Sequence, residues 1–201
     1  MGNYSRKILM MTFAGATAVL TLTGCGDTGS QVTSVTIDKE GKVANEIYEN
    51  FDQEYYDLQG LEDMAASEIS EYNVEYDAPK VSLDKVELLE DDTLAKLSMT
   101  YDSPSDYSHF NQVVLFYGTV EEARDRGYEV SGNLVDADGN KIDPEVLEGS
   151  GEKHIIITSE KININAPFNI EYMSKGAVLK GKKEADLSEV NTDTATLLLS
   201  K

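Results

Sequence analysis

Cysteine occurs once in this 201-residue chain, at position 25, so no disulfide within the chain can hold the fold together. The segments on its two sides differ in composition. Residues 1–24 carry two basic and no acidic side chains, whereas the following 177 residues carry 37 acidic and 15 basic ones, a net charge of −22. That length suffices for one domain with its own core, and the stability of this domain must come from packing.

The segment before the cysteine has the features of an export signal. Arg6 and Lys7 precede an apolar stretch over residues 8–22, which is interrupted only by threonines. A charged start, a short apolar run and small residues before a cut are typical of a secretory signal peptide. The run is shorter than the about 20 apolar residues that cross a bilayer. We therefore predict a signal peptide over residues 1–24, in place of a membrane span or a buried core helix.

The junction Leu22-Thr23-Gly24-Cys25 resembles the lipobox of bacterial lipoproteins at all four positions. The resemblance implies signal-peptidase cleavage between Gly24 and Cys25 and a diacylglycerol, carrying chains such as palmitate, on the Cys25 sulfur. Two acyl chains give a stable membrane anchor. Residues 25–31 would then be the lipidated cysteine and a flexible, Gly-rich tether, on the extracytoplasmic face of the cell membrane. The chain generally resembles small uncharacterised lipoproteins of Gram-positive anaerobes.

The charge of the mature chain restricts its partners. Residues 38–92 hold 18 acidic and 4 basic residues, whereas residues 150–201 hold 7 of each. Nucleic-acid binding needs a basic footprint, so it is excluded, and attraction to anionic lipid is excluded for the same reason. The membrane partner is therefore the covalent lipid on Cys25. A solvated surface that maintains solubility is the preferred interpretation of the acidic half; weak calcium binding by scattered carboxylates stays open.

Apolar periodicity predicts one long helix and one short one. Asp57 is placed to cap a helix that runs to about Asn73, and helical spacing puts its apolar residues on one face: Leu58, Leu61, Ala65, Ile69 and Tyr72. Thr119 and Glu122 match a capping box, which predicts a second helix ending at Gly127. Residues 103–110 are expected to form a short helix or a loop.

Strands account for most of the remaining sequence. Alternating or continuous apolar runs predict them over residues 32–38, 43–51, 80–89, 94–101, 112–117, 128–135, 155–158, 162–165, 169–173, 177–179 and 195–199. The expected fold class is α+β, a largely antiparallel sheet with about two helices. Residues 32–201 are expected to form one acidic extracytoplasmic domain. A division near Asn111 into two smaller α+β units is the alternative.

No motif supplies a recognisable catalytic or metal site. Residues 136–140 begin like a calcium loop, but Lys141 and Leu147 stand where an EF-hand has its glycine and its bidentate glutamate, so a hairpin turn is expected. His109 and His154 belong to no zinc pattern, and the Ser and Asp next to His109 are too close in sequence for a triad. We therefore assign no catalytic residue, metal ligand or cofactor; His154 is expected to begin a strand.

The preferred functional hypothesis is a non-enzymatic binding or envelope-associated module, whose wall, glycan or protein ligand the sequence does not identify. The alternative is a cell-surface hydrolase that acts on wall or glycan material through a carboxylate pair. A substrate-capturing transporter component ranks third, because the chain is short for two lobes. The tyrosines near Phe51, namely Tyr48, Tyr55, Tyr56 and Tyr72, are assigned to core packing in preference to a recognition surface.

Overall fold

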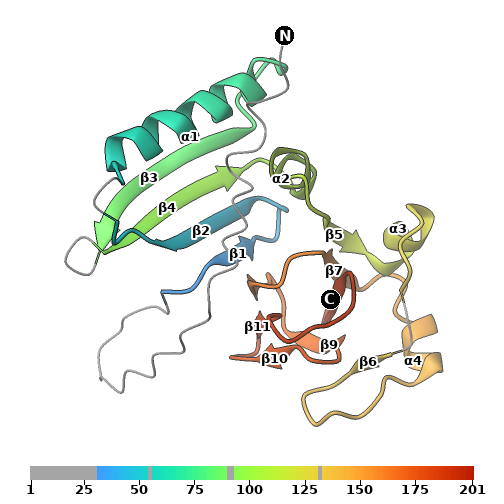
Figure 1. Cartoon of the computed structure of the whole chain (residues 1–201). Coiled ribbons are helices and arrows are strands. Elements are labelled where there is room, and N and C mark those ends of the chain that lie inside the picture. The colour runs from blue at the N-terminus through green and yellow to red at the C-terminus, as the bar shows by residue number, and fades with distance from the viewer. Residues whose placement is uncertain (1–30, 54–55, 90–92, 131–132) are drawn as a thin grey trace. The chain divides into compact units, whose positions relative to one another are not determined.

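The computed structural model describes residues 31–53, 56–89, 93–130 and 133–201 (Figure 1). The predicted signal peptide with its junction at Leu22 to Cys25, nearly all of the predicted tether and the predicted turn at residues 90–92 lie outside these ranges. Residues 32–201 form one compact unit. Within the described ranges, no helix combines the length and the apolar character that crossing a membrane requires.

The first half of the unit is an antiparallel ladder with one long helix. Its elements are β1 (Ser34–Ile37), β2 (Val43–Asn50), α1 (Leu58–Asn73), β3 (Val81–Leu89) and β4 (Leu94–Tyr101). β1 pairs with β2, β2 with β4 and β4 with β3, all antiparallel. Helix α1 therefore connects two strands that lie on either side of β4. β3 is the outermost strand at this end of the sheet and, among the described residues, pairs only with β4.

The second half adds three short strands to this sheet and builds another. Its elements are α2 (Pro104–Asn111), β5 (Leu115–Thr119), α3 (Val120–Asp125), β6 (Leu134–Val135), α4 (Pro144–Glu148), β7 (His154–Thr158), β8 (Asn163–Asn165), β9 (Ile170–Ser174), β10 (Val178–Leu179), β11 (Glu184–Asp186) and β12 (Ala195–Leu199). The first sheet has the order β10-β11-β8-β1-β2-β4-β3, and the second has the order β5-β7-β12-β9-β6. β1 and β8 are parallel, so the first sheet is mixed.

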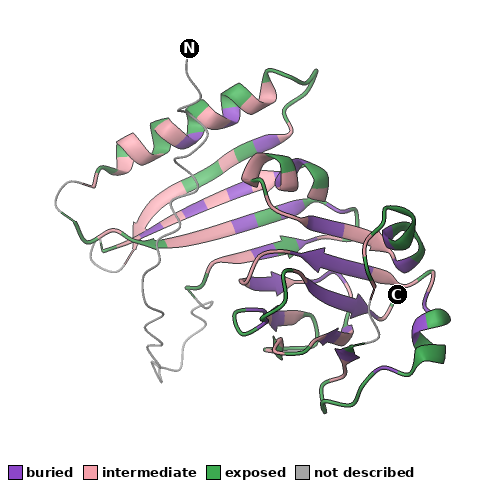
Figure 2. Ribbon diagram, turned by 45° about the vertical axis from the view of Figure 1, so that its right-hand side comes forward, coloured by how far each residue is buried: buried purple, intermediate pink, exposed green. Residues whose placement is uncertain are grey.

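Two hydrophobic cores pack the two sheets and the helices together; Figure 2 shows the buried residues. The larger core joins both sheets, for example Val35 and Tyr101 of the first with Leu197 of the second. The smaller core covers the other face of the second sheet, where Leu198 packs with Val120 of α3 and Leu147 of α4. β12 is thus buried on both faces, which explains its continuous apolar sequence. All described members of both cores lie within residues 32–201.

The structure confirms an α+β fold with mostly antiparallel pairing, and α1 begins after Asp57 and ends at Asn73 as predicted. The described residues differ from the prediction in having two sheets and four helices. Of the described residues between 128 and 135, only Leu134 and Val135 form a strand. The chain that leaves α3 is still bonded to that helix, because the Tyr128 N–H donates to the carbonyl of Ala123. β5 begins at Leu115, later than predicted, because Gln112 adopts φ 56° and ends α2.

Candidate functional site

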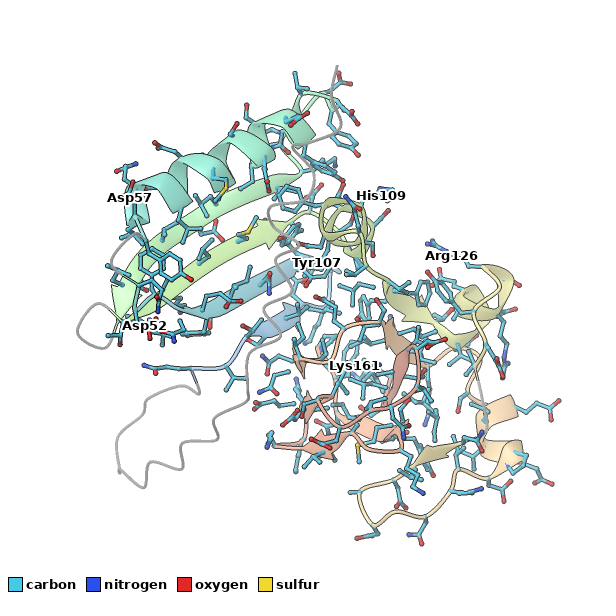
Figure 3. The ribbon with its side chains drawn as sticks, in the orientation of Figure 1. Asp52, Asp57, Tyr107, His109, Arg126 and Lys161 are labelled. Carbon is cyan, nitrogen blue, oxygen red and sulfur yellow. The ribbon has the colours of Figure 1, made fainter. Side chains whose placement is uncertain are left out.

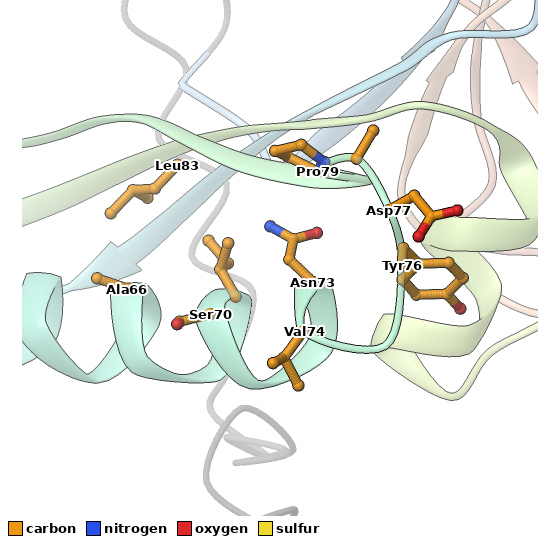
Figure 4. Close-up of a pocket in the computed structure, with 10 residues that line it drawn as sticks. Ala66, Ser70, Asn73, Val74, Tyr76, Asp77, Pro79 and Leu83 are labelled. Atoms are coloured by element: carbon orange, nitrogen blue, oxygen red, sulfur yellow. The ribbon is translucent and has the colours of Figure 1, made fainter.

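A shallow pocket of about 570 Å³ lies between the C-terminal half of α1 and the start of β3 (Figure 4). Ala66, Ile69, Ser70 and Asn73 of α1 line one side, and Leu83 of β3 lines the other. The loop at residues 74–79 closes one end. We call this feature the α1–β3 groove. It lies along the seam between a helix and the free edge of a sheet, where extended ligands bind in several protein families.

The local sequence explains why a groove forms at this seam. Asp57 caps α1 by accepting hydrogen bonds from the main-chain N–H groups of Gln59 and Gly60. From that start, helical spacing buries Ala65 and Ile69 against the sheet. The neighbouring flank presents Ala66 and Ser70, whose small side chains do not fill the space beside Leu83.

Asn73 joins the end of α1 to the start of β3. Its Nδ2 donates to the carbonyl of Val81 at 2.7 Å, and its Oδ1 accepts from the N–H groups of Val81 at 3.0 Å and Lys80 at 2.8 Å. The side-chain amide thus satisfies both main-chain groups of Val81, as a neighbouring strand would. This arrangement fixes the width of the groove at that end.

A hydrogen-bond network positions the loop that closes the groove. Tyr76 donates its hydroxyl to the Tyr72 oxygen at 3.2 Å, and Tyr72 donates to Oδ1 of Asp106 at 3.2 Å. Asp106 is buried and also accepts from Ser103 at 2.5 Å. Burial, together with these neighbours, raises the pKa of Tyr72 far above its ordinary value, so its hydroxyl stays a donor. The loop is therefore tied to α2.

The rim of the groove is apolar. Val74 is 80 % exposed, the highest value among the large exposed hydrophobic residues of the described chain, and Tyr76 is 37 % exposed. Both lie beside the groove (Figure 4). Val74 and Tyr76 therefore provide apolar area beside the groove that a ligand can bury.

The surroundings of the groove are strongly acidic. Residues 56–89 carry nine acidic residues and two lysines, a net charge of −7. Both lysines are engaged: Lys80 pairs with Asp102 at 2.7 Å, and Lys85 pairs with Glu87 at 2.6 Å. Burial and the nearby Glu71 raise the pKa of Glu68. The groove thus combines an apolar rim with a negative field that its own cations do not neutralise.

The motifs singled out in the sequence do not converge on this groove. His109 is exposed on α2, whereas Asp106 is bonded to Ser103 and Tyr72. His154 begins β7, as predicted, and its Nδ1 lies 3.0 Å from the carbonyl oxygen of Lys201. Within the ranges that the structure describes, no three His, Cys, Asp or Glu side chains are grouped to hold a metal ion.

Residues 136–140 form the predicted turn. Oδ1 of Asp136 accepts hydrogen bonds from the N–H groups of Asp138 and Asn140, both at 2.9 Å, and Gly139 adopts φ 83°. These donors lower the pKa of the Asp136 carboxyl. The carboxylate is thus used to stabilise the turn, which joins Leu134 to Ile142 through a main-chain hydrogen bond.

The aromatic group near Phe51 is divided in the structure. Phe51 contacts Tyr56, with 4.9 Å between the ring centroids, and Tyr48 lies under Nζ of Lys96 at 5.4 Å. Tyr72 lies at the other end of α1, and Tyr55 is outside the described residues. A contact that the sequence did not indicate joins buried Tyr107 (labelled in Figure 3) to half-buried Glu160. The tyrosine hydroxyl donates to Oε2 of the carboxylate at 2.5 Å.

The sequence analysis did not single out Asn73, Val74, Tyr76 or Asp77 for the groove. The available signal was a valine and a tyrosine among acids directly after a helix, which equally describes an ordinary loop. No protein-family model, no curated protein and no solved structure matches this chain. The functional argument therefore depends on the sequence and the geometry alone.

Proposed function

We propose that this protein is a lipid-anchored binding module on the extracytoplasmic face of a bacterial cell membrane, and that its α1–β3 groove is the binding surface. The observation that carries the binding role is the combination of an apolar, solvent-exposed rim at Val74 and Tyr76 with an acidic surround of net charge −7. The lipobox-like junction at Leu22 to Cys25 supports the location.

The rigid framework of the groove supports a binding role. Asn73 and the Tyr72–Asp106 contact hold the loop and the helix end in place. Ligand binding therefore costs little conformational entropy in the protein surface. The partner is expected to be positively charged, because desolvated carboxylates are stabilised by cations. The hydrolase acting through a carboxylate pair stays a prediction.

The anchor is tested by metabolic labelling with an alkyne analogue of palmitate. The full chain should take up label and sediment with membranes, whereas Cys25→Ser should do neither. Retention of both label and membrane association by Cys25→Ser would contradict the proposed anchor. This measurement is independent of the groove.

The binding surface is tested by site-specific photocrosslinking in intact cells. A crosslinking amino acid replaces Val74 in one variant and Val146 in the other; Val146 lies on α4 and is 42 % exposed, which makes it a matched control. We expect a discrete adduct from position 74 that is lost when Ser70→Arg is added, and none from position 146. Equal adduct patterns at both positions would argue against the groove.

A further inference from the structure

The mode of binding in the groove follows from the main chain of β3. The edge strand exposes N–H and C=O groups along its free side, a template that other chains can pair with. At Val81 those groups are already satisfied by Asn73. Because strand residues alternate, Leu83 is the next residue to direct its main chain to the same side. Leu83 also lines the groove.

The free edge continues beyond Leu83 with a change of register. The pairing with β4 shifts between Leu83 and Lys85, the mark of a bulge, and then runs to Leu89. Bulges and charged residues are the usual protection of an edge strand against unselective pairing. Here Asp84 accepts hydrogen bonds from the hydroxyls of Ser82 and Thr100, and Lys85 pairs with Glu87, so the strand itself carries a net charge of only −1. The main chain of the edge is therefore open to a strand, and selection by charge comes from the acidic residues beside the groove.

Charge also decides which occupant fits. A second copy of this chain would bring another acidic edge, with −7 over the same residues, and like charges facing each other oppose pairing. A segment rich in lysine or arginine would instead meet Asp77 and Glu62; Glu62 stands one helical turn before Ala66 on the same flank. Its apolar side chains would cover Val74 and Tyr76.

We infer that the groove binds an extended, cationic segment of a partner protein, which adds as a strand to the free edge of β3 from Leu83 onward. The inference depends on the proposed binding role of the groove and specifies its ligand and its geometry. Main-chain pairing would supply affinity independent of sequence, and the acidic rim would select positive charge.

The test uses residues 26–201, which contain both cores, together with two peptide probes and two variants. These are an eight-residue peptide of alternating lysine and valine, the matching glutamate–valine peptide, and the variants Ser70→Arg and Ser67→Arg. Ser70 lines the groove, whereas Ser67 is exposed on the same helix and does not line it. Calorimetry gives the affinity, and hydrogen exchange by NMR follows the Leu83 amide. A thermal melt of each variant checks folding.

We expect the lysine peptide to bind at least about tenfold more tightly than the glutamate peptide, and Ser70→Arg to weaken it by a similar factor while Ser67→Arg does not. Exchange of the Leu83 amide should slow at least about tenfold at saturation. Binding without that protection, equal losses in the two variants, equal affinity for both peptides, or no binding would overturn the inference. The photocrosslinking experiment still judges the proposed function in each case.

Discussion

The hydrogen bond between buried Tyr107 and half-buried Glu160 gives a sharp test of the energetics of the fold. Tyr107 is 1 % exposed, and its ring packs edge-on against Tyr101 with 4.8 Å between centroids. Its hydroxyl donates to the Glu160 carboxylate at 2.5 Å. Tyr107→Phe keeps the ring and removes only the donor, so no large cavity forms and the measured loss reports the hydrogen bond.

The expected loss depends on the charge of Glu160. Burial raises the pKa of Glu160 above its ordinary value of 4.5, while the hydrogen bond from Tyr107 acts in the opposite direction. Through burial alone, Glu160 favours the folded state fully below its unfolded-state pKa, and this contribution is lost as the pH rises through the folded-state pKa. The hydrogen bond from Tyr107 has the opposite dependence, because it stabilises the charged carboxylate. A bond to the charged form contributes about 1.5–3 kcal/mol, and one to the neutral form about 0.5–1.5 kcal/mol.

We therefore expect Tyr107→Phe to lower the free energy of unfolding by about 1.5–3 kcal/mol at pH 7.5, and by less as the pH falls through the raised pKa of Glu160 toward 4.5. Urea denaturation followed by far-UV circular dichroism measures both values. The other carboxylates titrate alike in the two proteins, so they cancel in the difference. In a Glu160→Gln background the loss should become independent of pH. A loss that is equal at both pH values in the native background would refute the reasoning.

Three further changes follow from the same structure. Gly176→Ala should destabilise the domain by at least about 2 kcal/mol, because φ is 99° and the new Cβ would lie 2.5 Å from the Glu189 carbonyl; Gly139→Ala, with open space around it, should cost about 1–2 kcal/mol. Asp57→Ala should cost about 1 kcal/mol, measured by urea denaturation, because α1 loses its cap. Leu197→Ala should cost about 2–5 kcal/mol, and a cost under 1 kcal/mol would mean that β12 is not central.

Elements encoded by local pattern were predictable from the sequence. Asp57 and the apolar spacing of residues 58–72 define α1, and the reciprocal contacts of Thr119 and Glu122 confirm the capping box. α4 was missed although Asp143 caps it and Pro144 occupies its first turn, because five residues give no periodicity. β11 is short and polar, and its strand identity comes from pairing with β8.

Features that depend on distant contacts were not predictable. The parallel pairing of β1 with β8 joins residues about 130 positions apart, and nothing in either segment indicates it. The groove is likewise a product of two segments, since Ser70 and Leu83 carry no joint pattern in the sequence. Sequence patterns report burial along one element, whereas a groove depends on what two elements leave unfilled.

The edge strands of the two sheets are protected against pairing with other chains in different ways. β10 and β6 are edge strands of two residues each, too short to template pairing, and β5 leads directly into α3. β3 is the remaining edge and has nine residues. Residues 56–89, which include this edge and helix α1, carry a net charge of −7, which opposes self-association and at the same time attracts a cationic strand. One charge distribution can therefore serve solubility and recognition together, so a solvated acidic surface and a binding surface need not be alternatives here.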